Sequence, residues 1–264
     1  MLNSVLRNMN KYFIHETNNI DGDNMDLKET IYKRQSIRKY DKTPLTEETL
    51  NEIKEFIDNA CVLNPDITWS YDIVGKSNVK TLQRFKAPHY LLIFSETEQN
   101  FLQNIGFIFQ QVDLYLQSRG IGSCWIGAGG PKNYENPNPN QDFVILLMFG
   151  NPSGELYRER TQFKRKIVCE ISDERDSKLI PAQLAPSAAN SQTWYFTHED
   201  DGSYNLYRNK RKLRLNKKME VWNQIDMGIA LAHMYVANRD TFKFTLDKAH
   251  EELKNKVFEG SFVI

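Results

Sequence analysis

The sequence is short of cysteine and has no regular spacing of metal-binding side chains. Its three cysteines, Cys61, Cys124 and Cys169, lie far apart and form no C-x-x-C pair. This argues against a disulfide framework and gives no zinc or dithiol motif, so we expect a reducing, cytoplasmic location and no metal site. The histidines form no paired ligand spacing either, and His233, on an apolar helix, is expected to be a satisfied core residue. They are His15, His89, His198, His233 and His250.

The chain also lacks net charge and long apolar runs. Lysine plus arginine and aspartate plus glutamate both total 34 among 264 residues, so no overall field draws the molecule to nucleic acid or to an anionic membrane. The longest apolar runs, 90–94 and 144–149, fall far short of the roughly 20 residues that a membrane span requires. We therefore expect a globular protein that acts on a small-molecule substrate, with no membrane partner.

Two segments stand apart from the rest of the chain. Residues 1–24 lack the apolar centre and cleavage site of a secretory signal, and because the pattern sharpens only at Met25 we expect them to be a poorly ordered extension. The run from Arg208 to Lys218 is rich in lysine and arginine, which favours a nucleic-acid-binding module as an alternative function. Such runs are more often solvated loops, so we expect no nucleic-acid partner.

Apolar periodicity and turn residues predict the main elements. Thr46 is a natural N-cap for the helix that follows it. The segment 101–119 is apolar on nearly all sides and ends at Gly120, a suitable C-cap, so it should be a central helix together with 222–237. Further helices are expected at 26–33 and 247–257. Strands are expected at 90–94, 144–150, 194–197, 204–207 and 242–246, with a hairpin turn at Asp201-Gly202.

The two halves of the chain resemble one another. The run Thr68-Trp69-Ser70-Tyr71 matches Thr193-Trp194-Tyr195-Phe196 at an offset of 125 positions, and the two apolar helices align at an offset of 122, with Gly106 matching Gly228. We therefore expect an ancient duplication, with a first half at 25–174 and a second half at 175–264. The expected fold is α+β, with a mixed β-sheet flanked by helices and the two apolar helices packed at the centre.

The segment Arg34-Gln35-Ser36-Ile37-Arg38 places two arginines and a serine at alternate positions. Because alternate side chains of an extended backbone point to one side, Arg34, Ser36 and Arg38 should face a ligand together. Each guanidinium can donate two parallel hydrogen bonds to a phosphate or reach a pyrimidine carbonyl. The alternative is a solvated basic strand edge.

The longest motif runs from Ala185 to Trp194 and reads APSAANSQTW. Pro186 and the small residues after it, such as Ala188, let the backbone approach a flat ring. Hydrogen bonds to the polar groups of such a ligand can come from Ser187, Asn190 and Gln192. A serine-capped turn before an aromatic strand is the alternative, but it does not account for the whole run.

Two further segments accompany these motifs. The run from Gly120 to Gly127, GIGSCWIG, follows a helix and leads into a strand, whereas a dinucleotide-binding G-x-G-x-x-G follows a strand and opens a helix. We therefore do not interpret it as a dinucleotide fingerprint. The segment 163–167 is basic, and its Lys164 and Arg165 are either a phosphate contact or simple surface charge.

Together these segments resemble the signatures R-R-S-I-R, A-P-S-x-x-N-x-Q-P-W, G-L-G-S-C-W-I-G and R-K-P-L of nitroreductase-like flavoproteins, over residues 26 to about 250. Thr193 stands in place of one family proline, and the proline of the fourth signature is missing. The resemblance implies a nitroreductase-like fold and FMN as the cofactor. The residues implied to hold it are Arg34, Gln35, Ser36, Arg38, Trp125, Ile126, Gly127, Lys164, Arg165, Pro186, Ser187, Ala188, Asn190 and Gln192.

The resemblance further implies an oxidoreductase with NAD(P)H as co-substrate that reduces nitroaromatic, quinone or similar acceptors through flavin N5. The chemistry belongs to the cofactor, so no catalytic side chain is expected, and Arg38 is the first candidate for the N1/O2 edge of the ring. A hydrolase is excluded because Ser187 lies outside any G-x-S-x-G. The alternative is an FMN-binding carrier or sensor with little turnover.

The order of the motifs departs from that of ordinary relatives. In ordinary relatives the second signature follows the first within a few tens of residues, and each cofactor site takes the two signatures from different subunits. Here Arg34 and Pro186 are 152 positions apart, and each half has kept the motif that the other has lost. The chain thus resembles a subfamily whose monomer mimics a family dimer. We expect one FMN site complete within one chain, with further association of chains left open.

Overall fold

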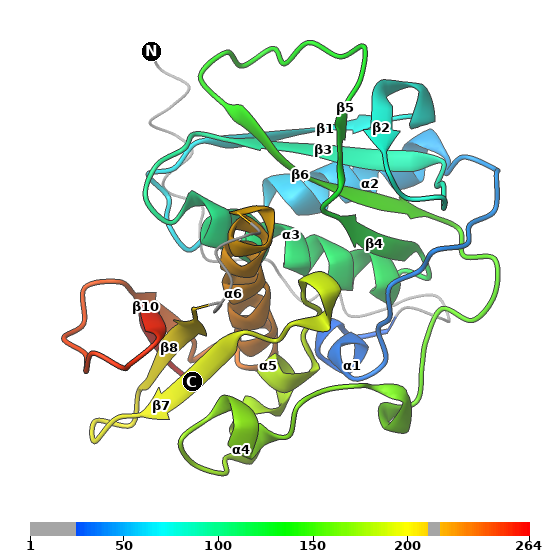
Figure 1. The fold of residues 1–264 in the computed structure, drawn as a ribbon. Helices are drawn as coiled ribbons and strands as arrows, with labels where there is room; N and C mark the ends of the chain where they lie inside the picture. Colours follow the sequence, from blue (N-terminus) through cyan, green and yellow to red (C-terminus); the bar gives the residue numbers. More distant parts are fainter. Residues whose placement is uncertain (1–24, 211–216) are drawn as a thin grey trace.

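The structure is a computed structural model that describes residues 25–210 and 217–264. The extension 1–24 and the greater part of the basic run 208–218 lie outside these residues. Figure 1 shows the chain as two β-sheets separated by helices. The helices are α1 (Leu27–Ile31), α2 (Glu47–Asp58), α3 (Phe101–Ser118), α4 (Val168–Ile171), α5 (Ile180–Leu184) and α6 (Lys217–Ala237).

The helix ends follow the expected local chemistry. The hydroxyl of Thr46 accepts a hydrogen bond from the Thr49 amide and caps α2, which satisfies one of the free amides of its first turn. Gly120 follows the end of α3 with φ 78°, a left-handed conformation that favours glycine. The predicted helices at 26–33, 46–60 and 101–119 are therefore confirmed, and the helix predicted from Trp222 is α6.

Two four-stranded sheets and one two-stranded sheet account for the strands. The first sheet has the order β1-β3-β6-β4, the second β7-β8-β10-β9, and β2 pairs with β5. The strands are β1 (Trp69–Val74), β2 (Val79–Thr81), β3 (His89–Ser95), β4 (Gly122–Ile126), β5 (Gly129–Pro131), β6 (Asp142–Gly150), β7 (Trp194–His198), β8 (Tyr204–Asn209), β9 (Lys243–Thr245) and β10 (Lys256–Val263).

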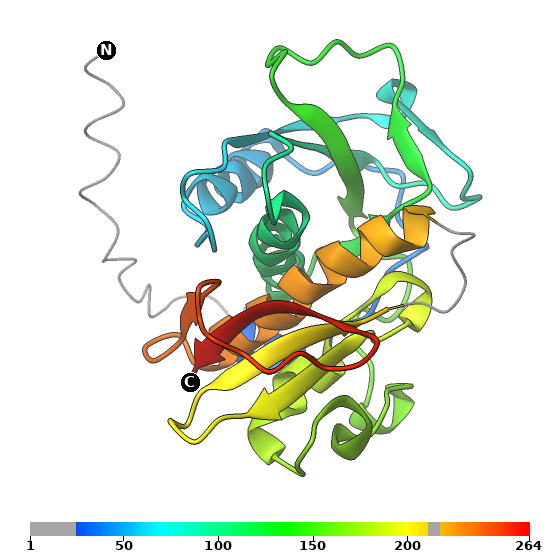
Figure 2. The same cartoon turned by 60° about the vertical axis from the view of Figure 1, so that its left-hand side comes forward.

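The two larger sheets share one topology. In each, the first and second strands along the chain pair, a long helix follows, and the fourth strand inserts between the second and the third. All strand pairs in both sheets are antiparallel. The central helices α3 and α6 lie between the sheets (Figure 2). Their apolar faces form one large core with residues of both sheets.

Two expectations about the strands were wrong, although the α+β class is confirmed. The strands form separate antiparallel sheets and not one mixed sheet, and the parallel pairing in the described part of the chain is the isolated bridge between Ser172 and Phe196. Residues 247–255 are irregular, and β10 begins at Lys256 where a helix had been predicted. Insertion between β8 and β9 supplies β10 with hydrogen-bond partners on both edges, which a short amphipathic helix would not gain.

Candidate functional site

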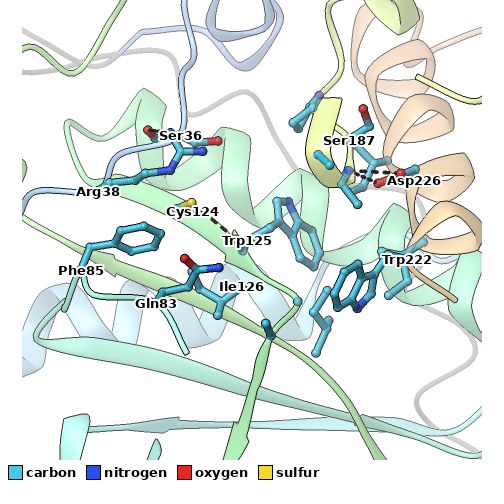
Figure 3. Close-up of a pocket in the computed structure, with 18 residues that line it drawn as sticks. Ser36, Arg38, Gln83, Phe85, Cys124, Trp125, Ile126, Ser187, Trp222 and Asp226 are labelled. Atoms are coloured by element: carbon cyan, nitrogen blue, oxygen red, sulfur yellow. Dashed lines mark hydrogen bonds between the residues drawn. The ribbon is translucent and has the colours of Figure 1, made fainter. Parts of the chain in front are cut away.

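A cavity of about 400 Å³ lies where the first sheet, the APSAANSQTW segment and the start of α6 meet. Figure 3 shows Arg38, Gln83 and Phe85 on one side of it, Ser187, Asp226 and Trp222 on the other, and Cys124, Trp125 and Ile126 between them. Three predicted segments thus meet at one place. The lining residues are Ser36, Arg38, Gln83, Phe85, Cys124, Trp125, Ile126, Gly127, Ala128, Ile145, Pro186, Ser187, Ala188, Ala189, Trp222, Ile225, Asp226 and Ile229.

Some residues of the Arg34–Arg38 segment line the cavity, and others lie behind its wall. Ser36 and Arg38 line the cavity, and the Arg38 guanidinium lies 5.9 Å from the centre of the Phe85 ring. Arg34 lies behind them, 1% exposed, with Nη2 3.5 Å from the Ser36 hydroxyl. Gln35 points away and donates to backbone oxygens of Glu155 and Tyr157, so its role is to hold the segment in place.

The buried partner of Arg34 is Asp113 on α3. Arg34 Nε lies 3.0 Å from Asp113 Oδ2, and neither side chain reaches solvent. The other carboxylate oxygen accepts a 2.7 Å hydrogen bond from the Ser123 hydroxyl on β4. Gln110 donates to Asp113 Oδ2 and accepts from the indole of Trp125 at 3.0 Å. This buried ion pair and the hydrogen bonds around it hold Arg34 and Trp125 in position.

His233 belongs to the same buried network and behaves as a core residue, as expected. Its Nδ1 lies 2.9 Å from the Pro181 carbonyl oxygen, and its Nε2 lies 3.1 Å from Gln110 Nε2. Burial, with a contribution from nearby Arg34, lowers the pKa of His233 to about 3. The ring is therefore neutral, with Nδ1 donating to the carbonyl and Nε2 accepting from the amide of Gln110.

Three guanidinium groups, those of Arg34, Arg158 and Arg165, lie near one another, and Arg34 is paired with Asp113. Arg158 donates to the Arg34 carbonyl and stacks on Phe163, with its guanidinium 3.6 Å from the ring centre. Burial and the charges of Arg34 and Arg165 lower the pKa of Arg158 to about 9, and burial and Arg34 lower that of Arg165 to about 10. Arg165 Nε is buried with no hydrogen-bond partner among the described residues. Such a group of cations fits a dianion such as a terminal phosphate.

The second motif forms a loop with unusual backbone conformations. Ala189, Asn190 and Gln192 have φ of 51°, 54° and 45°, in the left-handed region that is unfavourable for residues other than glycine. The Ser187 hydroxyl accepts from the Gln192 amide, which closes the loop on itself. This brings Pro186, Ser187 and Ala188 to the cavity wall.

The loop is also tied to the basic segment. Asn190 accepts a 2.7 Å hydrogen bond from Arg165 and donates to the Lys164 carbonyl. Gln192 Oε1 accepts from the Lys166 amide at 2.7 Å. Asn190 and Gln192 therefore do not line the cavity, and their side chains fix the position of Arg165.

An aromatic wall closes the cavity on the side of β4 and α6. A Cβ at Gly127 would lie 2.6 Å from the Trp222 ring, so glycine lets that indole pack directly on the strand end. Trp125 and Trp222 are both partly exposed at the cavity. Burial raises the pKa of the Cys124 thiol, against the lowering effect of Arg38 and Arg34, so this cysteine is a neutral part of the wall.

Eight of the fourteen residues predicted from the sequence line the cavity, and six do not. Arg34, Gln35, Lys164, Arg165, Asn190 and Gln192 lie behind the cavity wall. The lining residues that the motifs did not predict include Gln83, Phe85 and the α6 residues Trp222 and Asp226, and Arg158 near Arg34 was not predicted either. Among residues 25–210 and 217–264, no group of histidine, cysteine, aspartate and glutamate is arranged to hold a metal ion, and no helix has the length and apolarity of a membrane span.

Comparisons with known proteins agree with this architecture. A crystal structure of a putative nitroreductase from Thermotoga maritima has a TM-score of 0.61 at 20% identity, covering 94% of this chain and 97% of that chain. An FMN-dependent nitroreductase from Clostridium difficile R20291 has a TM-score of 0.41 at 18% identity, covering 50% of this chain and 94% of its own. A nitroreductase with bound FMN from Bacteroides fragilis has a TM-score of 0.40 at 20% identity, covering 51% and 93%.

No curated protein matches the chain. The family described as "Putative TM nitroreductase" matches residues 26–238, which is most of the sequence. The fold is therefore nitroreductase-like, and the chain belongs to this nitroreductase family.

Proposed function

We propose that the protein is an FMN-dependent oxidoreductase that takes reducing equivalents from NAD(P)H and passes them to a nitroaromatic, quinone or similar flat acceptor. The observation that carries the proposal is the cavity, which is lined by Arg38, by Ser36 and Ser187 and by an aromatic wall, with a group of arginines behind it. FMN has a phosphate at one end and a flat ring at the other, so its chemistry matches this division. When bound, FMN supplies hydride acceptance and one- or two-electron transfer.

The phosphate end of the cofactor fits the arginine group. Arg34 pairs with Asp113, the charges of Arg158 and Arg165 act on one another and on Arg34, and Arg165 Nε has no hydrogen-bond partner among the described residues. An added dianion would balance the excess positive charge and satisfy the unpaired donor. Ser36 and Ser187, on opposite walls, are placed to donate hydroxyl hydrogen bonds between the two ends.

The ring end fits the space between Arg38 and the aromatic wall. Arg38 offers positive charge at one edge of the cavity, and Gln110 holds the Trp125 indole through its Nε1. Proline and alanine at 186 and 188 leave the opposite backbone close to the cavity without bulky side chains. These residues bind and orient a ring and supply charge, while no side chain is required as a nucleophile.

We also propose that one chain forms the whole site by duplication of an ancestral half, with halves at 25–174 and 175–264. The common strand order of the two sheets supports this proposal. Ser36 and Arg38 come from one half and Pro186 to Ala188 from the other, so no partner chain is needed to assemble the cavity. The three unpaired cysteines support a reducing location, which we take to be the cytoplasm.

Steady-state oxidation of NADH and NADPH by the FMN-loaded protein tests the activity. We expect turnover with menadione and with a nitrofuran, and little turnover without added acceptor. The alternative, an FMN carrier or sensor, is consistent with the many hydrogen bonds of the loop around Ser187, which favour tight binding over exchange. Tight FMN binding with no acceptor-dependent oxidation of either nucleotide would favour that alternative.

A further inference from the structure

The first half of the chain contains a basic insertion between two paired strands. In the second sheet, β7 and β8 are joined by the short turn 199–203, whereas residues 75–88 separate β1 from β3 in the first sheet. This segment, called here the basic insertion, contains no aspartate or glutamate, although the whole chain has no net charge. Its basic residues are Lys76, Lys80, Arg84 and Lys86. The positive charge therefore lies in a segment that is not part of the topology shared by the two sheets.

The basic insertion reaches the cavity and forms part of its rim. Gln83 and Phe85 line the cavity, and Gln83 is exposed, so the insertion borders the opening (Figure 3). The Leu82 amide donates a hydrogen bond to the carbonyl oxygen of Ala128, which also lines the cavity. From these two residues the chain runs away from the cavity as the paired strands β2 and β5, which Figure 1 shows side by side. This small sheet therefore extends the cavity rim.

Three lysines gather around this small sheet. Lys76 lies just before β2, Lys132 directly follows β5, and Lys86 directly follows a cavity residue. Burial and the charges of Lys86 and Lys132 lower the pKa of Lys76, whose ammonium group lies 5.4 Å from the centre of the Tyr90 ring. Within the described part of the chain, no carboxylate pairs with any of the three. Their mutual repulsion is relieved when an anion lies among them.

The chemistry and position of the three lysines fit a phosphate monoester at some distance from the cavity. Ammonium groups bind phosphate as point charges, and a phosphate monoester carries close to two negative charges at neutral pH. Since β5 is three residues long, Lys132 lies roughly 13 Å along the strand from Ala128 in the cavity wall. The pyrophosphate of a dinucleotide separates its two nucleosides by a comparable length. NADPH differs from NADH by a phosphate monoester on the ribose of its adenosine.

We propose that Lys76, Lys86 and Lys132 bind the 2′-phosphate of NADPH, which makes NADPH the preferred reductant over NADH. The inference rests on the proposed function and extends it to the choice of nucleotide. The nicotinamide end enters the cavity past the rim at Gln83, and the adenosine end lies along β2 and β5. NADH presents an uncharged hydroxyl group at the same place, which leaves the three ammonium groups without a counter-ion.

The double variant Lys86→Gln/Lys132→Gln tests this in the FMN-loaded protein, because both lysines are exposed and glutamine keeps part of the side-chain length. For the wild type we expect kcat/KM with NADPH to exceed that with NADH by about tenfold or more. In the double variant, KM for NADPH should rise about tenfold or more, while KM for NADH should stay within about twofold of the wild type. The matched control Lys243→Gln removes an exposed lysine from β9 in the second sheet and should leave both KM values unchanged.

A binding measurement separates this inference from the proposed function. In isothermal titration with excess FMN present, adenosine 2′,5′-bisphosphate should bind the wild type about tenfold more tightly than adenosine 5′-monophosphate, and the double variant should lose this difference. If the protein oxidises neither nucleotide, the proposed function is refuted, and this titration still decides the inference. Equal binding of the two adenosine phosphates by the wild type would overturn it.

Two kinetic results would also overturn the inference. One is an equal rise in KM for NADPH and NADH in the double variant, because the lysines would then act on the pyrophosphate that both nucleotides carry. The other is inhibition of NADPH oxidation by inorganic phosphate as strong as inhibition by adenosine 2′,5′-bisphosphate. The lysines would in that case bind free phosphate and not the nucleotide.

Discussion

Gly106 and Gly228 each lie against the backbone of the other central helix. A Cβ at Gly106 would collide with the carbonyl oxygen of Ile225, and one at Gly228 with that of Gln103. Since both pairs are related by the same offset of 122 positions, the contact is reciprocal, like the contact across a two-fold dimer interface. This close approach of α3 and α6 sets the distance between the two walls of the cavity.

The variant Gly228→Ala should therefore be destabilised. The added methyl group meets backbone atoms, including the Phe107 nitrogen at 2.6 Å, and overpacking of this kind costs roughly 1–3 kcal/mol or more. That exceeds the gain of about 1 kcal/mol that alanine brings to a helix interior. Urea unfolding measures the difference. Gly75→Ala is the control, since nothing lies within 4 Å of a Cβ there, and equal stabilities of both variants and wild type would contradict the account.

The variant Arg38→Ala should lose FMN affinity. It removes a charge-assisted contact worth about 1.5–3 kcal/mol, so the dissociation constant should rise about tenfold or more. Fluorescence titration with FMN provides the measurement. Lys39→Ala is the matched control because Lys39 is exposed and does not line the cavity. If both variants bind FMN as the wild type does, Arg38 does not contact the cofactor.

Arg158 should distinguish FMN from riboflavin. Because we assign it to the phosphate end, Arg158→Ala should weaken FMN binding about tenfold and leave riboflavin binding, which involves no phosphate, nearly unchanged. Isothermal titration with both flavins gives the comparison. If Arg158→Ala weakens the binding of both flavins equally, Arg158 supports the fold of the segment around Phe163 and does not contact the phosphate.

His198 should make a pH-dependent contribution to stability. Burial opposes its charged form, but hydrogen bonds with Asp173 and Asp176 outweigh burial and raise the pKa of His198 above its ordinary value. The contribution is thus fully present below the unfolded pKa of about 6.5 and is lost as the pH rises through the folded pKa.

Urea unfolding of the wild type and His198→Asn at several pH values tests this. The difference in unfolding free energy between the wild type and His198→Asn should be largest at about pH 5.5. It should shrink toward about pH 8.5, where His198 is neutral in both the folded and the unfolded state. The pair is partly exposed, so the effect should not exceed about 1 kcal/mol. A difference that grows with pH would contradict the assignment.

Mixing two defective chains tests whether one chain forms the site. Arg38→Ala removes a first-half group, and Ala188→Trp fills the cavity from the second half. We expect no recovery of FMN binding after the two apoproteins are mixed, because each chain carries its own site. Recovery of tight binding would mean that motifs from different chains meet, as they do in a dimer with shared sites.

The motifs predicted residues of the cavity because each motif is a continuous run, and its residue types indicate a ligand contact without knowledge of the fold. Ser36, Trp125 and Ser187 could be found in this way. Arg158 could not, since its assignment depends on the approach of Arg34 and Arg165 in space. Nor could Asp226, which in the sequence belongs to no recognisable motif.

At the end of the chain, the strand order shared by the two sheets is more informative than local periodicity. Residues 247–257 have helix-like spacing, but 247–255 are irregular, and Lys256 and Val257 pair with β8. In the first half, the strand β6 follows an irregular segment after β4 and β5. The strand order of the first sheet, in which the fourth strand inserts between the second and the third, is the pattern that predicts β10 between β8 and β9.

The central claim is that the cavity between the two halves holds one FMN per chain. The most direct measurement is titration of the purified chain with FMN, followed by absorbance and by sedimentation of the loaded protein. The account predicts a yellow protein with a bound-flavin spectrum, saturating at one FMN per chain. A folded protein that shows no binding of FMN at concentrations of about 100 μM, a free energy weaker than roughly −5.5 kcal/mol, would contradict it.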